Sequence, residues 1–192
     1  MRVGVTLPSM GHLSQPDNLI QAAKAAEQLG YDTLWVADRL LYPVKPRTKY
    51  PVTADGSLPQ VYKRVLDPLD TLTFVAAHTT RIGLGTSVLD IPFYNPTTLA
   101  RRLTTLDILS NGRLRAGFGL GWSADEFAAA GANPKERGAR AVNSWRRSRP
   151  YGPKTRWSFT ATISPCRARS SAPSRCKNRI RRFISPPSRP LR

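Results

Sequence analysis

Two glycines and a tryptophan at the end of a predicted strand form the first pattern of residues that could bind a ligand. Gly119 and Gly121 stand where the chain passes from this strand into a helix, and Trp122 follows at once. Glycines let backbone N–H groups come close to a ligand, and a helix N-terminus favours an anion. We therefore predict a cofactor-binding turn, with Trp122 as a flat wall of the pocket. The alternatives, an ordinary tight turn and a merely packed Trp122, stay open.

A second group of polar side chains follows two other predicted strands. Asp38 and Arg39 come directly after the stretch 32–37, and His12 comes after the stretch 2–8. Arginine is always protonated at neutral pH, so Arg39 cannot relay a proton but could hold an anionic substrate or the cofactor ring. His12 could contact the substrate. For Asp38, a role as a helix cap or in a surface ion pair is an equal alternative.

The elements that must position these residues alternate between short β-branched runs and helical patterns. The predicted strands are 2–8, 32–37, 81–89 and 113–120, and the predicted helices are 17–29, 67–79, 95–109 and 123–130. This alternation predicts an α/β fold with parallel strands, either a doubly wound sheet or half of a (β/α)8 barrel. The first strand is not followed by GxGxxG, which weighs against a dinucleotide-binding sheet.

Local patterns also predict where the helices begin and end. Ser14 or Asp17 could cap the first helix, and Gly30 suits the position just after its end. Ser123 and Glu126 have the spacing of a capping box, in which each residue satisfies a backbone N–H of the other.

Two long stretches, AEQLGYDTLWVADRL and IGLGTSVLDIPFYNPTTLARRLTTLDILSNGRLRAGFGLGWSADEFAAAG, carry a resemblance to a known family. Together they resemble the bacterial luciferase-like monooxygenases, and among these the F420-dependent oxidoreductases, over residues 1–141. The resemblance implies a TIM barrel with its cofactor at the C-terminal ends of the strands. It implies coenzyme F420, or else FMN, and hydride transfer to, or oxygenation of, a small organic substrate.

The resemblance also implies roles for particular residues. Family members have a non-proline cis peptide bond at the end of strand three that backs the flavin ring, and the matching pair here is Ser87–Val88. Asp38 matches an acid that often precedes a catalytic histidine, but Arg39 stands in the place of that histidine. The long stretch 40–62 matches a lid or substrate-recognition segment. Its Tyr42, with other tyrosines, could line an apolar substrate pocket or could anchor the loop.

The last 50 residues have a different composition. All 12 Asp and Glu residues lie in 1–142, whereas 143–192 carry 14 of the 30 Lys and Arg residues. We predict a division into a truncated luciferase-like barrel, 1–142, and a disordered basic tail, 143–192. A frameshift near codons 138–143 explains this change, and translation of the downstream DNA in the other frames tests it. The alternative is a genuine basic arm that binds nucleic acid through charge and stacking.

Several classes of protein are not expected. No run of about 18 apolar residues suggests a membrane span, and no signal peptide is expected, so we predict a cytoplasmic protein. Cys166 and Cys176 do not have metal-ligand spacing, and no metal site or specific nucleic-acid partner is expected. Half a barrel leaves free sheet edges and inward-facing Val3, Leu34 and Leu84 without partners. We therefore expect impaired or absent activity and a possible homodimer.

Overall fold

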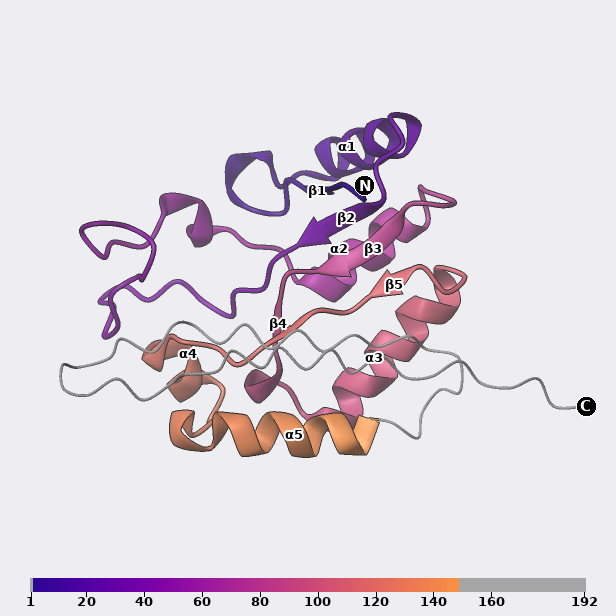
Figure 1. Cartoon of the computed structure of the whole chain (residues 1–192). Helices are drawn as coiled ribbons and strands as arrows, with labels where there is room; N and C mark the ends of the chain where they lie inside the picture. The colour runs from indigo at the N-terminus through magenta and orange to yellow at the C-terminus, as the bar shows by residue number, and fades with distance from the viewer. Residues whose placement is uncertain (1, 149–192) are drawn as a thin grey trace, which may run out of the picture.

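Four parallel strands form one sheet in the computed structural model, which describes residues 2–148 (Figure 1). The strands are β1 Gly4–Thr6, β2 Thr33–Val36, β3 Gly83–Thr86 and β5 Leu114–Arg115, with β4 Leu89–Asp90 and β6 Phe118–Gly119 paired beyond them. The helices are α1 Pro16–Gln28, α2 Pro68–Ala76, α3 Pro96–Leu109, α4 Ala124–Ala129 and α5 Arg137–Ser148. Short 3-10 helices are η1 Gly11–Leu13, η2 Gln60–Lys63, η3 Ile91–Phe93 and η4 Pro134–Glu136.

The order of the strands decides between the two predicted architectures. In the sheet they lie in chain order, β1-β2-β3-β5, and each neighbouring pair is parallel. A doubly wound sheet reverses its strand order at a switch point, whereas a barrel adds each strand beside the previous one. The described residues therefore form half of a (β/α)8 barrel, as predicted.

Two predicted strands are each divided in the structure. The stretch 81–89 becomes β3 and β4, which are separated at Ser87–Val88, where the peptide bond is cis. The stretch 113–120 becomes β5 and β6, and between them the backbone N–H and carbonyl of Gly117 both bond to the Thr86 hydroxyl. These breaks move β4 and β6 out of the main sheet, so that Asp90 and Gly119 lie beyond its C-terminal edge.

One face of the sheet was predicted to line an unfilled barrel interior, with Val3, Leu34 and Leu84 on it. The structure instead buries Leu34 and Leu84 of this face against helices. Leu34 and Leu84 are fully buried, in the same core as Leu72 of α2 and Leu103 of α3. They face the helices, so the expectation that they line an unpartnered barrel interior is wrong. Of these three residues only Val3 is exposed to solvent, with 41% of its surface accessible.

The other face of the sheet carries Trp35. Neighbouring residues of a strand point to opposite faces, so Trp35 points away from the helix-facing Leu34. Its indole lies over two glycines: a Cβ placed on Gly4 would be 2.2 Å from Trp35 Nε1, and one on Gly85 would be 2.4 Å from its ring. These positions therefore need glycine because Trp35 occupies the space.

The ends of two helices differ from the predicted caps. The N-cap of α1 is Gln15, without a side-chain bond, and Ser14 donates its hydroxyl hydrogen bond to Gly11, so the two predicted caps, Ser14 and Asp17, are wrong. Pro16 begins the helix, and its missing N–H makes a side-chain cap less necessary. The prediction for Ser123 is half right: its hydroxyl accepts from Glu126 N–H at 3.5 Å.

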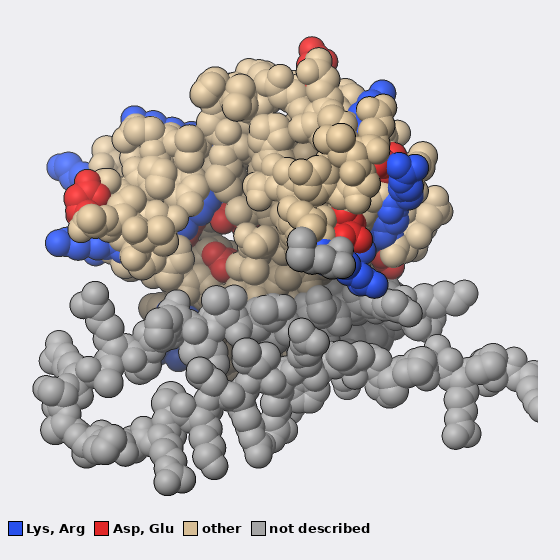
Figure 2. Space-filling view, turned by 45° about the horizontal axis from the view of Figure 1, so that its top comes forward, with Lys and Arg blue, Asp and Glu red and all other residues tan. Residues whose placement is uncertain are grey.

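The last described helix crosses the predicted boundary at residue 142. Helix α5 runs on to Ser148, and Ala141 and Ser144 are buried on it. The rest of the predicted tail, 149–192, lies outside the described residues. Over residues 2–148, no helix is both long and apolar enough to cross a membrane. Acidic and basic side chains are interspersed on the face shown in Figure 2.

Candidate active site

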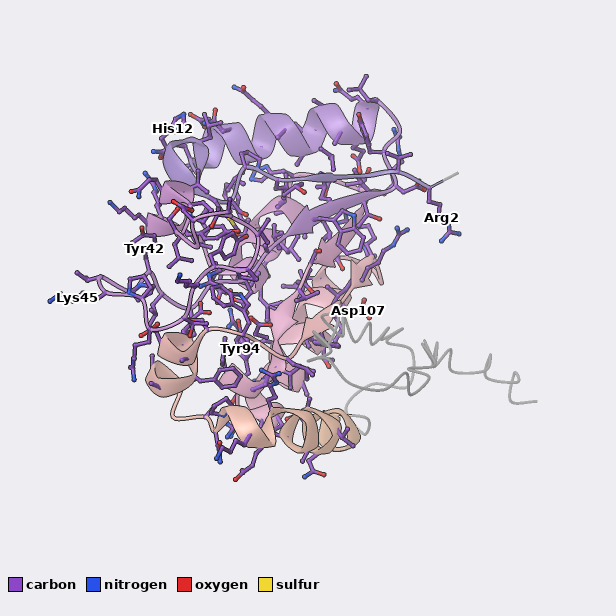
Figure 3. All side chains as sticks on the ribbon, turned by 60° about the vertical axis from the view of Figure 1, so that its left-hand side comes forward. Arg2, His12, Tyr42, Lys45, Tyr94 and Asp107 are labelled. Carbon is purple, nitrogen blue, oxygen red and sulfur yellow. The ribbon has the colours of Figure 1, made fainter. Side chains whose placement is uncertain are left out.

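The residues that could bind a ligand or take part in a reaction lie at the C-terminal edge of the parallel strands. Asp38 follows β2, Ser87 follows β3, Asp90 ends β4, and Gly121 follows β6. In Figure 3 the labelled His12 and Tyr42 lie toward one end of the molecule and Arg2 and Asp107 toward the other, with Tyr94 between them. This edge is where barrels of this architecture hold their active sites.

Asp38 is a largely buried acid held by two hydrogen bonds. Its Oδ2 accepts from the Tyr94 hydroxyl at 2.7 Å and from the Asp90 backbone N–H at 3.3 Å. Burial, the largest effect, raises the pKa of Asp38 to about 6, although both hydrogen bonds oppose it. Asp38 therefore takes neither of the structural roles considered from the sequence, the helix cap or the surface ion pair.

Asp90 is a second buried acid beside the first. Its Oδ1 accepts from the Gly121 backbone N–H at 2.9 Å, and its residue is 9% exposed. Burial and then the charge of Asp38 raise the pKa of Asp90 to about 7. Asp90 and Tyr94 were not predicted from the sequence. A charged residue at the end of an otherwise uncharged run, GLGTSVLD, was the available signal for Asp90.

The two glycines of the predicted turn make room for this chain's own side chains. A Cβ on Gly119 would lie 2.5 Å from Asp90 Oδ1, and one on Gly121 would lie 2.8 Å from Phe93 Cζ. Gly121 also has a φ of +70°, which disfavours other residues. Since its N–H already binds Asp90, the anion at this turn is the Asp90 carboxylate. A contact of Gly119 or Gly121 with a cofactor stays a prediction.

Arg39 points to Glu126 and away from solvent. Arg39 Nη2 lies 3.2 Å from Glu126 Oε2, and the two side chains are 7% and 1% exposed. The guanidinium also stacks on Trp122 and Tyr62, at 4.9 and 5.4 Å from the ring centroids. The ion pair is misaligned for a hydrogen bond, and within residues 2–148 Arg39 Nε and Nη2 and Glu126 Oε2 have no hydrogen-bond partner.

Besides its ion pair with Arg39, Glu126 binds the backbone at the start of the long loop. Its Oε1 accepts from the Leu40 backbone N–H at 2.9 Å, across 86 positions of the chain. Burial outweighs the attraction of Arg39 and raises the pKa of Glu126 above its ordinary value. The capping box is incomplete because this carboxylate binds the start of the long loop, and not the N–H of Ser123.

The loop 40–62 is tied to α4 and to its own far end. The hydroxyls of Tyr50 and Tyr62 are 2.9 Å apart, and Tyr50 also packs on Trp122, with centroids 5.5 Å apart. Arg47 bonds to Asp125 at 2.9 Å. These contacts favour the interpretation that Tyr50 and Tyr62 anchor the loop, and they show Trp122 packed beneath it.

The structure places the two predicted substrate residues on η1 and on the long loop 40–62. His12 is exposed on η1. Tyr42 is half-buried, and its contacts are Gln60, at 3.5 Å from its hydroxyl, and Lys63, over its ring. Within residues 2–148, neither is hydrogen-bonded to Asp38 or Asp90. Their contact with a substrate stays a prediction.

The Ser87–Val88 segment has the features that a flat cofactor ring needs. Its peptide bond is cis, as the resemblance implies, and Ser87 is exposed while Val88 is half-buried. The Ser87 N–H is bonded to the Val36 carbonyl at 2.7 Å, so the segment is fixed to β2 close to Asp38. The described residues thus fit the ring of a flavin or deazaflavin. They show no free glycine cradle for its phosphate, because side chains fill the space at Gly119 and Gly121.

The fold is that of an α/β barrel, and its strand ends carry two acids, Asp38 and Asp90, beside the cis peptide bond. Comparison with known proteins identifies the family. A family model described as luciferase-like monooxygenase matches residues 1–149. The chain therefore belongs to the luciferase-like monooxygenase family.

Individual relatives agree with this membership. An uncharacterised protein of Mycobacterium tuberculosis is 42% identical over 117 residues, which are 60% of this chain and 42% of the relative. An F420-dependent glucose-6-phosphate dehydrogenase of Amycolatopsis mediterranei is 36% identical over 133 residues, 67% of this chain and 35% of the relative. This chain thus matches well under half the length of either relative.

Solved structures show the same fold. The monooxygenase RslO1 from Streptomyces bottropensis superposes with a TM-score of 0.61 at 25% identity, over 78% of this chain and 42% of the other. An F420-dependent secondary alcohol dehydrogenase superposes with a TM-score of 0.59 at 20% identity, over 77% of this chain and 41% of the other. At that identity the second likeness concerns the fold alone.

Proposed function

We propose that this chain is the N-terminal part of a flavin- or deazaflavin-dependent oxidoreductase that acts on a small organic substrate. The observation that carries the proposal is the acid Asp38 at the C-terminal edge of the sheet, near the exposed cis segment Ser87–Val88. The relative from Amycolatopsis favours coenzyme F420, and FMN is the second candidate.

The proposed roles follow from the geometry. Ser87 and Val88 back the ring, and Asp38 exchanges a proton with the substrate, since an acid with a pKa of about 6 exists in both forms near neutral pH. Trp122 and Arg39 support the loop 40–62 above the site. When bound, the cofactor supplies the hydride, or the reduced ring that oxygenation requires.

We further propose that activity of this chain is impaired. The relatives are more than twice as long as the segment that matches them, and Gly119 and Gly121 are filled by neighbouring side chains. The grip on the cofactor phosphate and the second wall of the pocket then depend on groups outside residues 2–148. β1 and β5 are the outer strands of the described sheet, and an unpaired strand edge can pair with a second copy of the chain, so we include a homodimer in the proposal.

A titration of the purified chain with F420 and with FMN, followed by fluorescence, tests the proposed cofactor. We expect saturable binding, tighter for F420, and weak in both cases because the phosphate grip is incomplete. Ser87→Phe places a large ring on the exposed shelf and should weaken binding at least about tenfold, which is about 1.4 kcal/mol.

The matched control is Thr105→Phe, which adds the same ring to an exposed position near the C-terminal end of α3, the end opposite to the one that follows β4. It should leave the affinity unchanged. The proposal is contradicted if the folded chain binds neither cofactor. It is also contradicted if Ser87→Phe leaves the affinity for both cofactors unchanged.

The basic arm provides the second candidate function. Residues 143–192 carry 14 Lys and Arg and no acid, and most of them lie outside the described residues. If this arm binds nucleic acid, affinity must fall steeply with salt and must also depend on base sequence, because any such arm binds polyanions.

A further inference from the structure

The inner face of the sheet, which points away from α2 and α3, carries small and large residues on alternate strands. One row of register partners across the four strands consists of Thr6, Trp35, Gly85 and Arg115. Trp35 lies over Gly85. Arg115 lies over Gly83, where a Cβ would be 2.9 Å from its Cζ, and its guanidinium donates to the Thr33 hydroxyl. Barrels fill their interior from alternate strands, so this face has the pattern of half a barrel interior.

The outer edge of β1 presents backbone groups that can pair with a further strand. The Val3 carbonyl and the Leu7 N–H are bonded to the segment 32–35, each at 2.8 Å. Successive residues of a strand direct their N–H and C=O groups to opposite sides, so Gly4 and Thr6 direct theirs to the outer edge. Among residues 2–148 no strand pairs with this edge, and β5 has a neighbour in this sheet on one side only.

We infer that two copies of this chain close one eight-stranded barrel about a two-fold axis along its centre, with β5 of each copy beside β1 of the other. The inference rests on the homodimer of the proposed function and names its interface. The four strands are parallel and lie in chain order, so this rotation makes both new strand pairs parallel. Both free edges of each copy are then used, and assembly stops at two chains.

A second copy fits the inner face better than the basic tail 143–192 does. In the closed barrel, large side chains remain on alternate strands, because Arg115 on β5 of one copy is followed by Gly4 and Thr6 on β1 of the other. The basic tail carries no Asp or Glu, and the face already holds a cation. No acid among residues 2–148 forms an ion pair with Arg115.

Closure also completes the candidate active site. Rotation about the barrel axis leaves the C-terminal edges of both sheets at the same end, so the strand ends of the two copies form one ring. Asp38 and the cis segment 87–88 of each copy then face the strand ends of the other copy across this ring. The second wall of the pocket, which residues 2–148 of one chain do not supply, comes from the second chain.

The cost of closure is positive charge inside the barrel. Two copies of Arg115 enter one interior without a carboxylate from either described half, and like charges repel more strongly where solvent is excluded. Removal of this charge should therefore tighten the dimer, an effect that is expected only if Arg115 lies inside the interface.

Sedimentation equilibrium of the full chain without cofactor, over a range of concentrations, tests closure. High salt is needed because each chain has a formal net charge of +18, which opposes association at low ionic strength. We expect monomer and dimer and no larger species. Thr6→Pro removes an outward N–H at both new strand pairs and should weaken the dimer about tenfold or more. Thr6→Val keeps this N–H and should dimerise like the wild type.

Arg115→Met should tighten the dimer about tenfold. Its control is Arg101→Met, the same change at an exposed position of α3, which should have no effect. Addition of Thr6→Pro to Arg115→Met should abolish the gain, whereas non-specific association through the new methionine would survive it.

The inference is overturned if the wild type stays monomeric or forms a series of larger species. It is also overturned if folded Thr6→Pro dimerises like Thr6→Val, or if Arg115→Met loosens the dimer or acts like Arg101→Met. Should Thr6→Pro not fold, as circular dichroism would show, the two arginine variants still decide. Because no cofactor is present, a failure of closure is distinct from a failure of cofactor binding.

Discussion

Replacement of Glu126 by glutamine is expected to lower the free energy of unfolding by about 3–5 kcal/mol, the range for breaking a buried ion pair on one side. Glutamine keeps the shape of the side chain and can still accept from Leu40 N–H, but it leaves the buried Arg39 guanidinium without an opposite charge. The loss should appear in equilibrium urea denaturation followed by circular dichroism. The loop 40–62 should also become more sensitive to proteases, because the pair ties its first residues to α4.

Asp125→Asn is the matched control for this change. Asp125 precedes Glu126 and also binds the loop, but its partner Arg47 is 67% exposed. An exposed pair contributes little to stability, so this variant should be close to the wild type. The double variant Arg39→Met with Glu126→Leu should recover much of the lost stability, since a buried pair can be replaced by apolar residues. Equal effects of Glu126→Gln and Asp125→Asn would show that the buried pair does not hold the loop.

The stability of the chain is expected to fall as the pH rises from about 5 to about 8. The pKa values of Asp38 and Asp90 are raised from 3.8 to about 6 and about 7. Between 3.8 and these values the unfolded chain has released protons that the folded chain retains, so a rise in pH favours unfolding. At about 1.4 kcal/mol for each pKa unit, and with a reduction for solvent that still reaches the pair, the loss should be about 2–4 kcal/mol. Above about pH 8 the contribution is fully lost and the curve flattens.

Urea denaturation at a series of pH values measures this loss. Glu126, whose pKa is also raised, adds to the trend. Glu27, whose pKa is lowered, acts in the opposite direction only as the pH falls below its ordinary value of 4.5. The double variant Asp38→Asn with Asp90→Asn should lose most of the slope, whereas Asp17→Asn should keep it. A wild-type stability that rises over this range would contradict the raised pKa values.

Local chemistry determined much of the fold from the sequence alone. Asn95 before Pro96 predicts the start of α3, and the structure places both N–H bonds of that cap on the Asn95 side chain. Gly30 ends α1 with a φ of +80°, and Asn111–Gly112 makes the turn into β5 with two positive φ angles. These features depend on neighbouring residues only, so their residue types suffice to predict them.

The family resemblance extended this local knowledge to the site. It implied the barrel, the position of the cis bond at Ser87–Val88 and the strand-end location of Asp38. It could not supply Asp90 and Tyr94, because their part in the site depends on where the chain goes after the break between β3 and β4. The sequence pattern predicts one continuous strand over 81–89. Asp90 is then only the residue that follows this strand.

Only the tertiary structure decided what the charged residues do. Arg39 follows a strand end and suggested a ligand for an anion, but its partner is Glu126, whose own local pattern indicated a capping box. The glycines at 119 and 121 suggested room for a ligand, but the Asp90 carboxylate and Phe93 fill that room. In each case a side chain from a distant part of the chain competes with the local pattern. A buried charge without an opposite charge is costly, so the long-range contact prevails.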